Sequence, residues 1–403
     1  MPISLRAALM AGALCISGTA VRAEPISLSQ ALTLGAEQSP RISQAKALAD
    51  AAEARARQAG VGPNPEIGVT VENFGGTGPY RNFRTSETSL ELSQRLELGG
   101  KRSARVAVAK AERDFALLAF ARAQFDLARD VRVAHAELKA AEDRAVLARD
   151  NVGRAQELAR TAGLLVEAGR DPPLRKLRAD ALLAEAQAEQ TRSFADMLAA
   201  RRLLASLIGS NDPELSAGDT SDQPPPPEVA HDVSGLDERL SEAERDAARA
   251  RIKLAQATAV PDVTASAGVR RFADGRETAV VAGFSIPFPI RDRNRGGIAA
   301  AQADSLASEA SLAQTRLDAK RARHDAQFAF DAAQMRVEAL SGAGATQAEE
   351  ALRIARAGYA AGKFSLVELI DAQQAYNSAK LLLIEARLDR ARAAAALVRA
   401  NAQ

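Results

Sequence analysis

Residues 87–102 read ETSLELSQRLELGGKR, and this stretch contains the change of periodicity that decides the fold. From Thr88 to Leu98, apolar residues alternate with polar or charged ones, which is typical of a half-buried β-strand. Gly99-Gly100 ends the alternation, and an alanine-rich segment without proline follows as far as Asp171. Its apolar residues recur at spacings of three and four, so the sequence predicts a strand that leads directly into a long helix.

The predicted helix is too long for a compact domain. Residues 101–166, if helical throughout, would extend about 100 Å at a rise of about 1.5 Å per residue. A similar three-and-four spacing runs from Leu366 to Ala386. Both segments indicate coiled-coil-like helices packed side by side, and therefore an elongated molecule.

The same order of landmarks occurs twice, which indicates an internal duplication. Asn64-Pro65-Glu66 is matched by Val260-Pro261-Asp262, Gly99-Gly100 by Gly296-Gly297, and Glu167-Ala168-Gly169 by Ala360-Ala361-Gly362, with offsets within four residues of one another. Between the copies lies a linker, residues 209–235, which contains Pro224 to Pro227. We therefore expect a first repeat at 24–208 and a second at 236–403.

Each repeat contains two predicted strands, at 67–71 and 88–98 in the first and at 263–269 and 280–288 in the second. Their length and one-sided apolar pattern match membrane-spanning β-strands. Four strands are too few to close a barrel, and open edges are not tolerated in lipid, so three chains would supply twelve strands. The alternative is a water-soluble periplasmic protein in which the two hairpins pack together as a sandwich.

The N-terminus has the build of a secretory signal, with Arg6, an apolar run at 7–16 and Val21-Arg22-Ala23 before a cut at Glu24. The alternative is a buried N-terminal helix. Cys15 is the only cysteine and lies inside this signal, so the mature chain can form neither a disulfide nor a thiolate metal site. A lipid anchor on Cys15 is not expected, because Gly12 stands where a lipoprotein signal has leucine.

Charge and composition exclude several other classes. The chain has 53 Lys and Arg against 51 Asp and Glu, and it becomes neutral once Arg6 and Arg22 are removed with the signal. We therefore expect no nucleic-acid partner. Outside the signal, no apolar run of about 18 residues predicts a transmembrane helix.

Five stretches together resemble the TolC-type outer-membrane factors of tripartite exporters: 64–66, 91–102, 286–296, 359–362 and 369–372. Gly99-Gly100-Lys101-Arg102 and Asp292-Arg293-Asn294 are most similar to the heavy-metal branch, the cobalt-zinc-cadmium and copper type. The resemblance implies a mainly α fold with a homotrimeric α-barrel and a twelve-stranded transmembrane β-barrel. It also implies an outer-membrane protein that extends into the periplasm and works with a periplasmic adaptor and a resistance-nodulation-division pump.

The resemblance further implies roles for residues at the periplasmic tip. The adaptor-docking turns would contain Gly169, Tyr359 and Gly362. Glu368 and Asp371 would form a pore constriction of carboxylate rings, which favours cations; the alternative is that both are solvated charges on an exposed face. Asp171, Arg175 and Arg178 are a hypothetical gating latch, because the two arginines occupy the first-repeat positions equivalent to Glu368 and Asp371.

Two departures from the family pattern affect gating. Ser341 to Gly344 stands where the family often has a proline, so we expect a kink or break there. Phe364 stands where well-known members carry a basic residue.

Competing functions remain open at this stage. We expect no enzyme, because the sequence has no nucleophile elbow, phosphate loop or zinc motif, and neither a cofactor nor a metal site is expected. His135, His231 and His324 are too scattered to form a ligand set and are expected at the surface or between helices. A periplasmic adaptor or coiled-coil scaffold is the alternative class, and drugs or small organic molecules are the alternative cargo.

Overall fold

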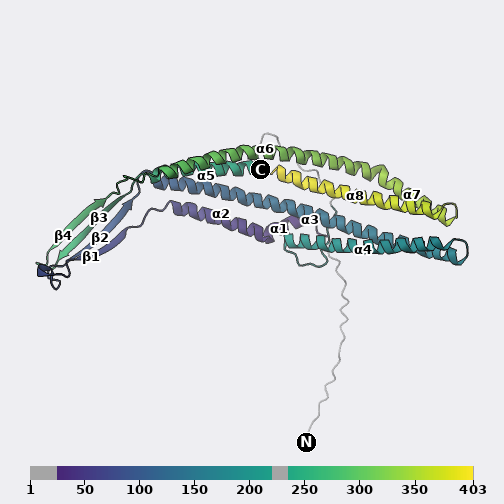
Figure 1. Ribbon diagram of the computed structural model, residues 1–403, viewed down its shortest axis with the longest axis horizontal. Helices are drawn as coiled ribbons and strands as arrows, with labels where there is room; N and C mark the ends of the chain where they lie inside the picture. Colours follow the sequence, from purple (N-terminus) through teal and green to yellow (C-terminus); the bar gives the residue numbers. More distant parts are fainter. Residues whose placement is uncertain (1–24, 220–234, 403) are drawn as a thin grey trace, which may run out of the picture.

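The computed structural model describes residues 25–219 and 235–402. The predicted signal, residues 1–23, lies outside the described residues, as do residues 220–234 of the predicted linker. The molecule is an elongated bundle of helices with a small β-sheet at one end and two helix–helix turns at the other (Figure 1).

Both halves of the chain place helices before a pair of strands and long helices after it. In the first half, α1 (Leu28–Gln38) and α2 (Pro40–Ala59) precede β1 (Glu66–Glu72), β2 (Glu87–Leu96), α3 (Lys101–Glu167) and α4 (Pro173–Ile208). In the second, α5 (Leu236–Thr258) precedes β3 (Val263–Phe272), β4 (Thr278–Ser285), α6 (Arg295–Ala339), α7 (Ala345–Ala360) and α8 (Leu366–Ala400). The predicted long helix is therefore confirmed, as is the strand–turn–strand order of each half.

The break in the second long helix is also confirmed. Residues Leu340–Gly344 form a π-helical segment between α6 and α7, and Gly342 has φ −77° and ψ −110°, outside the helical region. The glycine-rich segment therefore interrupts the helix at the place where the sequence predicted a kink or break.

One landmark of the predicted duplication is displaced. The residue preceding α3 is Gly100, with φ 73°, whereas the residue preceding α6 is Asn294, with φ 54°. Asparagine tolerates this left-handed conformation better than most other residues. The structural equivalent of Gly100 is therefore Asn294, and Gly296-Gly297, which the sequence comparison paired with Gly99-Gly100, lies inside the first turn of α6.

The four strands form one antiparallel sheet in the order β1-β2-β3-β4. Their register places apolar residues opposite one another in rows that cross the sheet, on a single face. One row is Val69, Leu90, Val269 and Val280, and the next is Ile67, Leu92, Ala267 and Ala282. Glu91 and Arg270 lie on the opposite face, so the predicted separation of apolar and polar faces is confirmed.

The predicted strand ends were partly wrong. β2 ends at Leu96 and β4 at Ser285, whereas the alternation predicted strands to Leu98 and Phe288. Pro287 and Pro289 carry no N–H to donate to a neighbouring strand, so regular pairing stops before them although the apolar alternation continues.

The bundle has two sections along its length, one near the sheet and one near the tip, and different helices pack together in each (Figure 1). Near the sheet, α3 packs against α2 and α5, and α5 packs against α6; towards the far end, α3 packs against α4 and α8, while α8 packs against α6 and α7. A core at the junction contains the fully buried Leu138, Leu204 and Ile208. None of the helices in the described part of the chain has the length and apolar character needed to cross a bilayer.

An arginine near the C-terminus connects three helices at this junction. Arg399 of α8 donates to Asp126 of α3 at 2.5 Å and to Asp237 of α5 at 2.9 and 3.0 Å. The side chains of Arg399 and Asp126 are only 12% and 18% exposed, so removal of one partner would leave a poorly solvated charge. The network therefore helps to fix how the two halves of the chain meet.

Candidate functional site at the helical tip

The two helix–helix turns at the tip have the same pattern of backbone hydrogen bonds. In the first, between α3 and α4, Gly169 has φ +65° and the Arg170 N–H donates to the Leu165 carbonyl at 2.9 Å. In the second, between α7 and α8, Gly362 has φ +71° and the Lys363 N–H donates to the Gly358 carbonyl at 2.8 Å. Glycine is favoured at both left-handed positions because it has no Cβ, so the two turns are copies of one helix-ending motif.

Side chains distinguish the two turns. Asp171 occupies in the first turn the position that Phe364 occupies in the second. The Phe364 ring lies over the Cα of Gly358, where a Cβ would collide with it. One turn therefore carries a carboxylate and the other an aromatic ring at equivalent places.

The structure brings Asp171, Arg175 and Tyr359 together. Arg175 donates to one carboxylate oxygen of Asp171. The other oxygen of Asp171 and the hydroxyl of Tyr359 are both buried without a hydrogen-bond partner. Burial, and next the negative charge of Asp171, raise the pKa of Tyr359, while Arg175 opposes the rise. This cluster joins the two turns, whereas the sequence assigned Tyr359 and Asp171 to separate roles.

Arg178, the third member of the predicted latch, lies apart from this cluster. It is exposed on α4 one turn beyond Arg175, and it makes no ion pair with the described residues. Arg175 itself pairs with Asp171 four residues earlier in its own chain, so within a single chain this ion pair does not connect two helical hairpins.

Glu368 is held by the start of α8. Its Oε2 accepts from the Ser365 N–H at 2.6 Å, and the Glu368 N–H donates to Ser365 Oγ at 3.3 Å. The hydrogen bond from the Ser365 N–H lowers the pKa of Glu368, so its carboxylate stays ionised. This is a capping box, which the spacing Ser365-Leu366-Val367-Glu368 would have revealed and which the sequence analysis missed.

Asp371 differs from Glu368 in its surroundings. It lies one turn further along α8, is exposed, and has no hydrogen-bond partner among the described residues. The structure therefore separates the two predicted constriction residues into one that also caps a helix and one that carries a free carboxylate.

An apolar cluster holds the two tip hairpins against each other. Leu158 and Ala162 of α3 and Ala179 of α4 pack with residues of α7 and α8. The members from α7 and α8 are Leu352, Ala355, Leu366 and Leu369. The tip is thus a packed four-helix end with the polar cluster beside its turns.

A layer of polar side chains crosses the seam between α3 and α8 above this cluster. Asn151 Oδ1 accepts from Gln373 at 3.0 Å and from Asn377 at 2.9 Å, and Arg154 donates to the Asn377 amide oxygen at 3.0 Å. The guanidinium of Arg154 also lies 5.2 Å from the centre of the Tyr376 ring. The sequence gave no sign of this layer, because its members are more than 200 residues apart.

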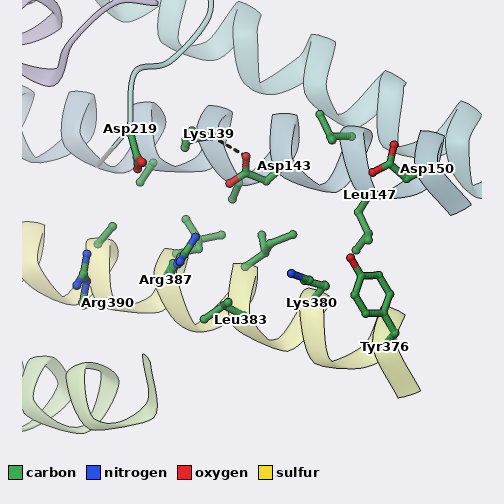
Figure 2. A pocket seen from close by; sticks show the side chains of 16 residues that line it. Lys139, Asp143, Leu147, Asp150, Asp219, Tyr376, Lys380, Leu383, Arg387 and Arg390 are labelled. Atoms are coloured by element: carbon green, nitrogen blue, oxygen red, sulfur yellow. Dashed lines mark hydrogen bonds and ion pairs between the residues drawn. The ribbon is translucent and has the colours of Figure 1, made fainter. Parts of the chain in front are cut away.

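A shallow pocket of about 370 Å³ lies between α3 and α8 next to this layer (Figure 2). Lys139 pairs with Asp143 at 2.6 Å on one wall, and Tyr376 and Lys380 line the other. Asp219 reaches over it from the segment after α4 (Figure 2). Lys380, Arg387 and Arg390 line the α8 wall, whereas Asp143, Asp150 and Asp219 line the opposite wall, so the pocket carries charges of both signs (Figure 2).

Histidines and carboxylates form no obvious metal site. His135 is completely buried, its Nε2 lies 2.9 Å from the Ile26 carbonyl, and burial lowers its pKa. His324 stacks on Phe328, with ring centroids 6.5 Å apart, and His231 lies outside the described residues. In the ranges 25–219 and 235–402, no three His, Cys, Asp or Glu side chains gather closely enough to hold a metal ion.

Comparison with known proteins matches the family described as outer membrane efflux protein over residues 31–210 and 239–403. The chain belongs to this family. As an outer membrane efflux protein it functions in export at the outer membrane, and its helical tip points into the periplasm.

Relatives of this efflux protein include two metal-resistance proteins of Cupriavidus metallidurans. The cobalt-zinc-cadmium resistance protein CzcC is 30% identical over 368 residues, which cover 89% of this chain and 86% of CzcC. The nickel and cobalt resistance protein CnrC is 35% identical over 308 residues, covering 75% of this chain and 72% of CnrC.

Solved structures share the fold of this efflux protein at low identity. The outer membrane channel CmeC of Campylobacter jejuni matches with a TM-score of 0.81 at 14% identity, covering 93% of this chain and 85% of CmeC. CusC matches with a TM-score of 0.80 at 17% identity, covering 93% of this chain and 92% of CusC.

Proposed function

We propose that this efflux protein is the passive outer-membrane duct of a tripartite system that exports heavy-metal cations. Three chains form it, with a twelve-stranded β-barrel in the membrane and an α-barrel through the periplasm. A periplasmic adaptor binds its tip, and an inner-membrane pump of the resistance-nodulation-division class drives export. Residues 1–23 act as the export signal, and two repeats at 24–208 and 236–403 flank a linker at 209–235.

The sheet carries this proposal. Its apolar face is exposed in the single chain, with Val280 83% and Phe284 79% accessible. Its outer strands, β1 and β4, each pair with only one described strand, so each presents an unpaired edge. Lipid covers an apolar face but cannot satisfy an open edge, whereas joining β4 of one chain to β1 of the next satisfies both edges. Because β1 and β4 run in opposite directions, this joint continues the antiparallel order.

The tip supports the periplasmic part of the proposal. The matched turns around Gly169 and Gly362 present two similar surfaces per chain, with Tyr359 beside them, and an adaptor with repeated hairpins would dock there. Threefold symmetry would arrange Glu368 and Asp371 as rings of carboxylates near the axis. The cap at Ser365 lowers the pKa of Glu368, and rings of carboxylates attract cations.

The tip cluster supplies the latch. Asp171 and Arg175 form an ion pair at the first turn, next to Tyr359 of the second, and Arg178 is free to meet a carboxylate of a neighbouring chain. Charge reversal by Arg175→Glu with Arg178→Glu should raise the leak conductance of the reconstituted protein in a planar bilayer. Unchanged conductance would remove the latch from the account and leave the duct intact.

Relatives support the metal cargo, because the names of CzcC and CnrC refer to resistance to cobalt, zinc, cadmium and nickel. The decisive test is deletion of the gene, followed by growth on divalent and monovalent metal salts and on unrelated dyes and antibiotics. We expect sensitivity to metals and rescue by the wild-type chain. Sensitivity confined to dyes and antibiotics would show that the exported cargo is drugs and not metal cations.

A rescue with Glu368→Ala and Asp371→Ala together tests the carboxylate rings. The variant should assemble in the outer membrane and fail to restore metal resistance. Arg192→Ala with Asp196→Ala, an exposed ion pair on α4, provides the matched control and should restore resistance.

A further inference from the structure

Apolar residues continue along the protein beyond the paired strands, at the end of the sheet where the helices begin. Ile286 and Phe288 follow Phe284 at spacings of two, so they continue the alternation of β4 on the apolar side. Phe288 is 85% exposed and Ile290 is 73% exposed. Leu96 at the end of β2 and Leu98 just beyond it continue the alternation in the same way and are also exposed. The apolar face therefore extends past the last paired residues towards the periplasm.

Arginines cluster directly after these apolar residues. Arg291, Arg293 and Arg295 lie within five residues of one another, and Arg102 lies at the equivalent start of α3. All four are exposed, and none forms an ion pair with a described carboxylate. Arg293 donates only to the backbone carbonyl of Pro289, at 3.3 Å.

Two carboxylates at this junction are paired with basic side chains of the protein. Asp262 pairs with Lys101 at 2.6 Å, and Glu97 pairs with Arg105 at 2.6 Å. Asp292 accepts from the Asn294 N–H at 2.8 Å. The four exposed arginines outnumber the unpaired carboxylates near them, Glu66 and Asp292, so the junction carries net positive charge next to an apolar surface that water does not solvate well.

We propose that residues 286–295, together with Arg102, form a binding belt for anionic phospholipid headgroups of the periplasmic leaflet. Ile286, Phe288 and Ile290 lie among the acyl chains, and Arg291, Arg293 and Arg295 bind phosphate oxygens at the headgroup level. This inference rests on the proposed function, because it requires the apolar face of the sheet to lie in lipid. The belt would set the depth of the barrel in the membrane.

Two features favour lipid over a protein partner. The apolar side chains are followed directly by arginines without ion pairs. A membrane changes in the same order, from apolar acyl chains to charged headgroups. The apolar patch is also continuous with the apolar face of the sheet, so one surface of lipid covers both. Arginine binds phosphate through several N–H donors at once, which suits a diester headgroup.

The absence of tryptophan from the chain gives a clean experiment. Phe288→Trp introduces a single fluorophore into the belt, and Phe284→Trp introduces one into the middle of the exposed face of β4. Each full-length mature variant is reconstituted in phosphatidylcholine vesicles that contain either brominated phosphatidylglycerol or brominated phosphatidylcholine. Bromine quenches tryptophan by contact, so quenching reports which lipid lies beside each site.

We expect brominated phosphatidylglycerol to associate at position 288 more strongly than brominated phosphatidylcholine, by about fivefold for each arginine that contributes. Arg291→Gln, Arg293→Gln and Arg295→Gln together should lower the ratio to about the fivefold that Arg102 alone would supply. Arg81→Gln, Arg84→Gln and Arg276→Gln, at the opposite end of the sheet, make the matched control and should leave the ratio unchanged. At position 284 the two lipids should quench equally.

Each contrary result has a defined meaning. Equal quenching by both lipids at position 288, or a ratio that survives the triple substitution at 291–295, overturns the belt. Quenching at 284 but not at 288 overturns the belt while the membrane barrel stands, because protein then covers Phe288. If tryptophan is quenched at neither position 284 nor position 288, both the belt and the lipid-facing sheet of the proposed function are overturned.

Discussion

Glu368 has two roles in this structure, and substitutions at Ser365 and Glu368 separate them. Ser365→Ala removes the side chain that accepts the Glu368 N–H at 3.3 Å, but it leaves the carboxylate of Glu368 in place. Glu368→Gln removes the charge, but a glutamine oxygen can still accept from the Ser365 N–H, since glutamine serves at this position of a capping box. Ser365→Ala therefore weakens the start of α8, whereas Glu368→Gln weakens the negative electrostatic potential at the proposed constriction.

The magnitude for Ser365→Ala follows from the loss of a helix cap, about 1 kcal/mol. The remainder of α8 is held by its packing against α3, α6 and α7, so the loss should increase local opening of the first turn and not unfold the protein. A change of about 1 kcal/mol corresponds to roughly fivefold faster hydrogen exchange at the Glu368 amide. Amides in the middle of α8, such as that of Leu383, should exchange at the wild-type rate and provide the internal control.

The assay for the charge is the reversal potential of the reconstituted protein under a salt gradient. Glu368→Gln and Asp371→Asn should each shift it towards lower cation preference, whereas Ser365→Ala should leave it close to the wild-type value. The reasoning is refuted if Ser365→Ala changes selectivity as much as Glu368→Gln does. It is also refuted if neither Glu368→Gln nor Asp371→Asn changes selectivity.

Three other predictions test the sheet, the junction core and a buried histidine. Gly268→Ala should abolish assembly, because a Cβ there would collide with the Leu90 carbonyl oxygen, whereas Gly68→Ala, with open space around it, should still give oligomers on unheated gels. Leu204→Ala should destabilise the protein by about 2–5 kcal/mol in urea denaturation because it empties a fully buried site, and the neighbouring Leu203→Ala, 46% exposed, should cost far less. Burial lowers the pKa of His135 in the folded state, so the unfolded state binds the proton more readily, and stability should fall as the pH drops below the ordinary histidine value of about 6.5. His135→Gln keeps a donor for the Ile26 carbonyl and should show a flatter dependence of unfolding on pH between about 7 and 5; parallel curves for the two proteins would contradict this.

Local periodicity was enough to predict most of the architecture. The alternation in 87–98 and the proline-free run after Gly100 predicted β2 and α3, and the glycine-rich Ser341 to Gly344 predicted the break before α7. These features depend on residues within one or two turns of each other. The predicted strand ends are wrong where strand pairing stops for another reason, as before Pro287 and Pro289, which have no N–H to donate.

Contacts between distant residues could not be predicted. Tyr359 and Asp171 are 188 positions apart in the chain, and they meet only because the two helix–helix turns lie at the same end of the bundle. The same holds for Asn151 with Gln373 and for Arg399 with Asp126. The cap at Ser365 is a different case, because its four-residue motif is local and could have been identified.

Cysteine cross-linking tests the central claim, that three chains close one barrel by joining β4 of one to β1 of the next. The mature chain that we infer has no cysteine, so Val69→Cys combined in turn with Val280→Cys, Ala282→Cys or Phe284→Cys introduces a single pair on the apolar face. At least one pair, oxidised in outer membranes, should give linked dimers and trimers and no larger species. Absence of links for all three pairs, or a ladder that continues beyond three chains, would contradict it.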